Sequence, residues 1–272
     1  MAPRPIRPPF AHPAFSLGAA LLASSLAQAQ GLSDPPLARP IDRRFTYVEE
    51  SLHGALPGRF ELEQWATWKH DTEADSSFDR IDFKTEIEYG ISEGVHFAVD
   101  LVEWHWVDSA TEERTKYDMS AAELKWRLSD PRHDAVGFAY KTELGLGPRM
   151  LEWENVLIVD KIVDRWEIAY NLMLGAGWEG EKTFEFEESE GELRQSLGAS
   201  YEFQPTLFVG AELFYEKPLP DWEWEGRENF FLGPNLAVRG HEWALTTTAL
   251  FLGSGGDDEP AFQLRVIFEV DF

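Results

Sequence analysis

The feature of this sequence that most constrains its fold is a strict two-residue alternation of apolar and charged side chains. It is clearest over residues 80–89, where every even position is charged and every odd position is apolar or threonine. A helix would place charge on every side of this segment, whereas a strand puts all of it on one face. Similar segments of roughly ten residues recur about twelve times along the chain, which predicts an all-β fold. They lie near residues 59–69, 79–89, 95–106, 117–128, 135–146, 151–161, 166–178, 193–203, 207–215, 230–238, 243–252 and 261–272.

The connections between these segments alternate in length. Those after even-numbered segments are tight, at residues 90–94, 129–134, 162–165, 204–206 and 239–242. Those after odd-numbered segments are longer and acidic, at residues 70–78, 107–116, 179–192, 216–229 and 253–260, with a short exception at 147–150. Tight turns on one rim and long loops on the other are typical of membrane barrels. The prediction is an antiparallel up-and-down transmembrane β-barrel of about 12 strands, with both termini periplasmic.

The polar stripe is predicted to face the lumen of this barrel. It carries glycines such as Gly137 and Gly175 among its charges, which suits a narrow interior better than a solvated surface. Aromatic residues such as Trp126, Trp166 and Tyr215 lie near the ends of the apolar stripe, as in the girdles of membrane barrels. The predicted lumen-lining residues are Arg80, Asp82, Lys84, Glu86, Glu88, Asp100, Glu123, Lys125, Arg127, Lys141, Glu143, Arg194, Glu202, Glu212, Arg265 and Glu269.

The chain ends on an alternating strand with a terminal phenylalanine. Its apolar positions are Leu264, Val266, Phe268, Val270 and Phe272. This segment resembles the C-terminal signal of Gram-negative outer-membrane β-barrels, which the barrel-assembly machinery recognises. The resemblance covers the general plan of residues 59–272 and implies a location in the outer membrane, in contact with its lipid. Residues 56–65 also resemble the opening of some uncharacterised outer-membrane proteins, which implies no particular role.

The N-terminal region has the pattern of an export signal. Arg4 and Arg7 precede an apolar run, and Ala27-Gln28-Ala29 fits a small-x-small cleavage site. We therefore expect residues 1–29 to be a cleaved signal peptide, 30–57 a periplasmic N-terminal linker and 58–272 the transmembrane barrel. Within the linker, residues 45–57 have apolar content without alternation, so they are also candidates for a short strand or a plug of the periplasmic mouth.

Composition excludes several classes of protein. The 49 acidic residues exceed the 24 basic ones and give a net charge of −25, which argues against nucleic-acid binding. The absence of cysteine excludes disulfide scaffolds and thiol catalysis. No cofactor motif and no spaced metal-ligand motif is found. Acidic loops, for example around residues 187–188 and 257–259, are expected to bind divalent cations only weakly.

Twelve strands is also the size class of outer-membrane phospholipases and lipid A deacylases. A serine esterase needs a serine within hydrogen-bond reach of a histidine. None of the histidines after the predicted signal peptide has a serine two positions later. His96, with Asp100 on the same face, is the only candidate for a triad, and a pore-lining role explains it as well. No catalytic residue is predicted.

The predicted function is that of a passive, porin-like channel for small polar or cationic solutes. Carboxylates exceed bases on the polar stripe, and rings of carboxylates select cations. The alternative is a non-conducting barrel, filled by ion pairs, that presents acidic extracellular loops. A lipid-modifying enzyme is the third possibility.

Overall fold

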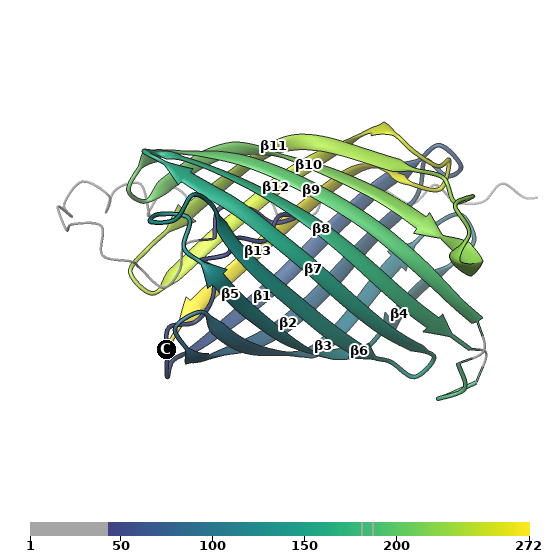
Figure 1. The fold of residues 1–272 in the computed structure, drawn as a ribbon. Coiled ribbons are helices and arrows are strands. Elements are labelled where there is room, and N and C mark those ends of the chain that lie inside the picture. Colours follow the sequence, from purple (N-terminus) through teal and green to yellow (C-terminus); the bar gives the residue numbers. More distant parts are fainter. Residues whose placement is uncertain (1–42, 181, 187) are drawn as a thin grey trace, which may run out of the picture. The chain divides into compact units, whose positions relative to one another are not determined.

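The structure, a computed structural model, describes residues 43–180, 182–186 and 188–272. The predicted signal peptide and the first part of the predicted linker lie outside these residues. Thirteen strands form one antiparallel sheet (Figure 1). The strands are β1 (Phe60–Thr72), β2 (Asp79–Ser92), β3 (Val95–Asp108), β4 (Glu113–Tyr117), β5 (Ser120–Ser129), β6 (Gly137–Leu146), β7 (Met150–Val163), β8 (Trp166–Glu179), β9 (Glu188–Gln204), β10 (Leu207–Leu219), β11 (Asn229–Arg239), β12 (Trp243–Ser254) and β13 (Pro260–Asp271).

The sheet closes into a barrel because its first and last strands pair. β1 is hydrogen-bonded to β13 on one side and to β2 on the other, with Glu61 opposite both Asp271 and Glu88. The remaining strands pair with their sequence neighbours, except that β5 pairs with β3. The predicted up-and-down barrel fold is confirmed. Each strand differs from its predicted segment mainly at its ends, where alternation fades into the loops.

One barrel position is shared by two strands. The segment predicted as a single strand over residues 117–128 is broken at Asp118 and Met119, so that β4 pairs with one half of β3 and β5 with the other. Glu103 of β3 spans the break, since its carbonyl accepts from Asp118 N–H and its N–H donates to the Met119 carbonyl. The closed wall therefore has 12 strand positions plus one short extra strand.

The wall has the polarity expected of a protein in lipid. Leu101, Ile168 and Leu174 are 50–55% exposed on the outer surface. Glu61 and Glu212, by contrast, are fully buried on the inner face. Such an apolar exterior is unfavourable in water and suits a hydrocarbon environment.

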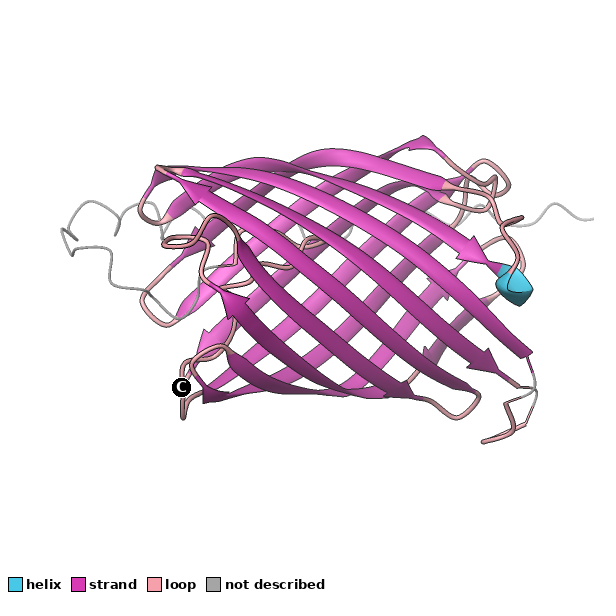
Figure 2. Ribbon diagram, in the orientation of Figure 1, coloured by secondary structure: helices cyan, strands magenta, loops and turns pink. Residues whose placement is uncertain are grey.

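The two rims differ. The tight turns and the C-terminus lie at one rim, and the long loops lie at the other, where the 3₁₀ turn η1 (Pro220–Trp222) is found (Figure 2). Across the described residues, no helix combines the length and apolar character needed to cross a membrane.

Candidate functional site

The N-terminal residues 43–56 lie inside the barrel, and we call them the plug. Phe45, Val48 and Ala55 of this segment are at most 2% exposed. The expected periplasmic linker thus does not extend away from the barrel over these residues but folds back into the half of the lumen near the tight turns. Lack of alternation is the only sequence signal that sets this segment apart from the strands.

Charged wall residues bind the first two residues of the plug. Arg43 forms an ion pair with Glu63 of β1 at 2.8 Å and another with Glu269 of β13. Arg44 pairs with Glu167 of β8 at 2.9 Å. Buried guanidinium groups are stable only with such partners, so these contacts fix the plug against opposite sides of the wall.

The backbone of the plug is bound by wall carboxylates and amides. Glu212 of β10 accepts hydrogen bonds from Thr46 N–H at 2.9 Å and Tyr47 N–H at 2.6 Å. Asn171 of β8 accepts from Glu49 N–H, and Asp160 of β7 accepts from the N–H of Ser51. An irregular segment in a narrow barrel needs such partners, because its backbone groups cannot pair with one another.

Glu49 connects the plug to two wall lysines. Its carboxylate lies 3.4 Å from Lys125 Nζ and 3.1 Å from Lys141 Nζ. Burial alone would raise the pKa of Glu49, but the ammonium groups of Lys141 and Lys125 hold it well below its usual range. The plug therefore carries a partly buried negative charge at neutral pH.

Two aromatic side chains anchor the plug by packing. Phe45 lies against Gly198 of β9, where a Cβ atom would be 2.6 Å from its ring. Tyr47 packs against Phe231 and Leu250, and its hydroxyl donates to Gln263 at 3.2 Å. Full burial of one such ring contributes about 1.5–3 kcal/mol.

The half of the lumen near the long loops is an open cavity of about 670 Å³, which we call the vestibule. Thr46, Tyr47, Val48 and Glu49 of the plug form part of its lining. Its bases come mainly from β1, β2, β4 and β13, and half of its acids come from β6 to β10. The lining bases are Lys69, Arg80, Lys84, Arg114, Lys116, Lys141, Arg194 and Arg265, and the lining acids are Glu49, Asp82, Glu103, Asp118, Glu143, Glu152, Glu154, Glu179, Glu216 and Glu259.

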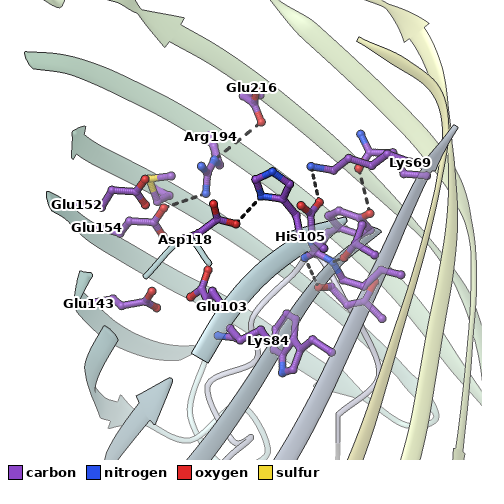
Figure 3. Close-up of a pocket in the computed structure, with 18 of the residues that line it drawn as sticks. Lys69, Lys84, Glu103, His105, Asp118, Glu143, Glu152, Glu154, Arg194 and Glu216 are labelled. Carbon is purple, nitrogen blue, oxygen red and sulfur yellow. Dashed lines mark hydrogen bonds and ion pairs between the residues drawn. The ribbon is translucent and has the colours of Figure 1, made fainter. Parts of the chain in front are cut away.

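Several of these charges pair across the vestibule wall. Arg194 lies between Glu154, at 2.9 Å, and Glu216, at 3.9 Å (Figure 3). Glu103 and Glu152 also point into the cavity (Figure 3), and neither has a basic group within ion-pair distance among the described residues. The vestibule therefore retains carboxylates that are free to meet an entering cation.

The predicted lumen residues fall into three groups. Glu86, Glu88, Asp100, Glu123, Lys125, Lys141, Glu212 and Glu269 are buried, most of them around the plug. Arg80, Asp82, Lys84, Glu143, Arg194 and Arg265 line the vestibule. Arg127 and Glu202 lie towards the turns instead, where Arg127 pairs with Glu93 and the N–H of Glu202 donates to the Arg165 carbonyl.

The functional residues that the sequence did not indicate are vestibule carboxylates such as Glu103 and Glu152, and charged side chains of the plug. In the plug, Arg43 and His53 are buried and Glu49 is partly buried. Burial and the nearby Arg43 charge lower the pKa of His53 to about 4, so its imidazole is neutral at pH 7. His96, the candidate triad histidine, contacts Glu88 at 2.8 Å, and no hydrogen bond described for it reaches a serine.

Comparison with known proteins agrees with the fold. A family model described as a family of unknown function (DUF6662) matches residues 155–265. No curated protein sequence matches the chain.

Solved structures show the same architecture. The NanC porin aligns with a TM-score of 0.53 at 7% identity, covering 78% of this chain and 98% of that porin. The KdgM porin in complex with disordered oligogalacturonate gives 0.51 at 12% identity, covering 78% and 99%. The beta domain of the Bordetella autotransporter Brka gives 0.52 at 9% identity, covering 79% and 100%. The chain thus has the fold of outer-membrane porins and autotransporter barrels.

Proposed function

We propose that this protein is an outer-membrane channel for small cationic or polar solutes, gated by its own plug. The observation that carries this proposal is the division of the lumen. One half is an open, charged vestibule, and the other half is filled by residues 43–56. Export by a cleaved signal peptide, with the tight-turn rim facing the periplasm, is part of the same proposal.

The vestibule supports the solute class. A volume of about 670 Å³ lies within the usual range of small-molecule sites. Its acids outnumber its bases, and carboxylates without a paired base favour cations. The porins among the structural neighbours support a transport role for this fold.

The contacts of the plug support gating. Most are ion pairs and hydrogen bonds, such as those of Arg44, Glu49 and Ser51. Water can replace these contacts when the plug leaves, because the exposed wall is equally polar. A plug held mainly by apolar packing would not exchange with water in this way.

The density of the same contacts favours the second candidate, a non-conducting barrel that presents its long acidic loops outside. Ion pairs at the start and in the middle of the plug, at Arg43 and Glu49, resist its release. In that case the vestibule would be a binding site without an exit.

A cross-link between plug and wall separates the two candidates. The chain has no cysteine, so Ser51→Cys with Asp160→Cys introduces one pair at a site where the native side chains are 2.7 Å apart. In planar bilayers we expect no conductance from the oxidised pair and cation-selective conductance after reduction. The single variants Ser51→Cys and Asp160→Cys, each insensitive to reductant, are the controls.

Two results would contradict the channel. Equal conductance in the oxidised and reduced states would show that the plug does not gate the lumen. A folded barrel that stays silent after reduction, and also when Glu49 is replaced by glutamine, would favour the non-conducting barrel.

A further inference from the structure

The seam where the barrel closes carries an unusual array of carboxylates. In the strand registers, Glu61 of β1 lies opposite Glu88 of β2 and Asp271 of β13. Two residues further along β1 and on the same inner face, Glu63 lies opposite Glu86 of β2 and Glu269 of β13. Their side chains are buried in the lumen. Like charges placed directly opposite each other on neighbouring strands are destabilising. The array therefore needs positive charge from elsewhere.

The described residues supply only part of that charge. Lys84 pairs with Glu86, and His96 contacts Glu88. Arg43 forms ion pairs with both Glu63 and Glu269.

Two carboxylates of the array have no hydrogen-bond donor. Glu61 is fully buried and Asp271 is 2% exposed, and none of their four oxygens has a hydrogen-bond partner among the described residues. A buried carboxylate without a partner is strongly unfavourable unless it binds a proton or a cation.

His53 of the plug points into this array. Its Nε2 atom lies 3.4 Å from Glu61 Oε1, 3.6 Å from Glu269 Oε2 and 3.7 Å from Glu63 Oε1. These separations are too long for good hydrogen bonds. The shortest lies within, and the other two slightly beyond, the separation of about 3.0–3.5 Å between neighbouring ligand atoms around one divalent ion.

We propose that His53, Glu61 and Glu269 form a binding site for one divalent first-row metal ion, of which Zn²⁺ is the reference case. One atom from each of the three side chains lies within 4.8 Å of the other two. One imidazole with two carboxylates is a ligand set that such ions accept. Asp271, opposite Glu61 in the register, is the nearest further carboxylate for the ion or its bound water.

The position of His53 is fixed by its neighbour Gly54. This glycine has a φ of +138°, and a Cβ atom there would lie 2.3 Å from His96 Nδ1. The backbone next to His53 therefore lies directly against β3.

Metal binding requires one proton of His53 to move. Arg43 Nη2 lies 3.3 Å from His53 Nδ1, which places the imidazole proton on Nε2 in the metal-free state. Binding through Nε2 moves this proton to Nδ1 and breaks that contact. Arg43 keeps its contacts of 2.8 and 3.0 Å with Glu63, so the guanidinium remains anchored.

The site would act as a latch, because it joins the plug to both strands of the seam. This consequence rests on the proposed function, whereas the site itself does not.

The metal site is tested by titration. The chelator-treated full-length barrel, folded in detergent, is titrated calorimetrically with Zn²⁺ and optically with Co²⁺. One equivalent of each is expected to bind, with Co²⁺ showing visible absorption bands of low-coordinate geometry.

Variants test the assignment. Glu61→Gln and His53→Ala are expected to abolish stoichiometric binding, while Glu113→Gln, the same change at an exposed carboxylate of β4 outside the vestibule lining, leaves it intact. Glu61→Gln is an isosteric change that removes an unpaired buried charge, so the barrel is expected to fold, with a higher thermal midpoint than the metal-free wild type.

Absence of uptake by the folded wild type would overturn the site, as would uptake that both Glu61→Gln and His53→Ala leave unchanged. Conductance with and without chelator tests the latch separately. Binding at the seam with no effect of chelator on conductance would refute the latch and leave the site standing.

Discussion

Replacing Glu49 by glutamine tests whether the plug is held by the charges described above. The substitution keeps the size of the side chain and the bond from Glu49 N–H to Asn171. It removes the negative charge between Lys125 and Lys141. Lys141 retains its ion pair with Glu123 at 2.9 Å. Lys125, which is 2% exposed, loses the one ion pair described for it.

The cost follows from leaving that lysine unpaired. Removing one partner of a buried ion pair costs about 3–5 kcal/mol. The side chain of Glu49 is 20% exposed to the vestibule, so water compensates part of the loss and we take the lower limit. About 3 kcal/mol shifts the balance between closed and released plug roughly 150-fold towards release.

A single cysteine at Val48 reports this balance. Val48 is 2% exposed, so a thiol at this position reacts with a charged reagent only when the plug is released. In the Val48→Cys background, we expect Glu49→Gln to accelerate labelling roughly 150-fold. Glu152→Gln should leave the rate unchanged, and adding Lys125→Met to Glu49→Gln should recover most of the protection.

Equal labelling rates with and without Glu49→Gln, in barrels that both show heat-modifiable migration, would refute the reasoning. So would an equal acceleration by Glu152→Gln, since that residue is part of the vestibule and makes no described contact with the plug. In the first case the packing of the plug, not its charge, would hold it in place.

Three further predictions follow from the same structure. Because the folded-state pKa of Glu49 is depressed, its contribution to closure is present above about pH 4.5 and lost as the pH falls further, so channel opening in bilayers should increase on acidification below that value. Leu197→Arg, on the lipid-facing side of β9, should reduce folding stability in vesicles by about 2–4 kcal/mol, measured by denaturant titration against Leu197→Ala. Phe272→Ala should lower the assembled fraction in cells while leaving refolding in detergent unchanged, and normal assembly in cells would contradict its role in the terminal signal.

The barrel could be predicted from the sequence because its wall is periodic. Residues 80–89 separate charge from apolar surface only as a strand, and β2 pairs over this whole segment. The break at Met119 was not predictable in the same way. It depends on a close contact with Gly145 of a neighbouring strand, where a Cβ atom would lie 2.5 Å from the Met119 sulfur.

The sequence left residues 45–57 as a candidate short strand or plug, but the contacts of the plug could not be predicted because they are not periodic. Arg43 and Arg44 follow a proline-rich stretch and resemble a solvated linker. Their partners Glu63, Glu167 and Glu269 are brought together only by closure of the barrel. The sequence indicated an acidic inner face, but some of the side chains that neutralise it come from outside the strands.

The position of the plug in the chain constrains the order of folding. Residues 43–56 precede the first strand, yet the Thr46 carbonyl accepts from Arg265, 219 residues later. Arg43 similarly spans β1 and β13, which come together only when the cylinder closes. Contacts of such long sequence separation form late. The first described part of the chain therefore reaches its final partners only after the last strand has joined, so the plug would serve as a checkpoint for completed assembly.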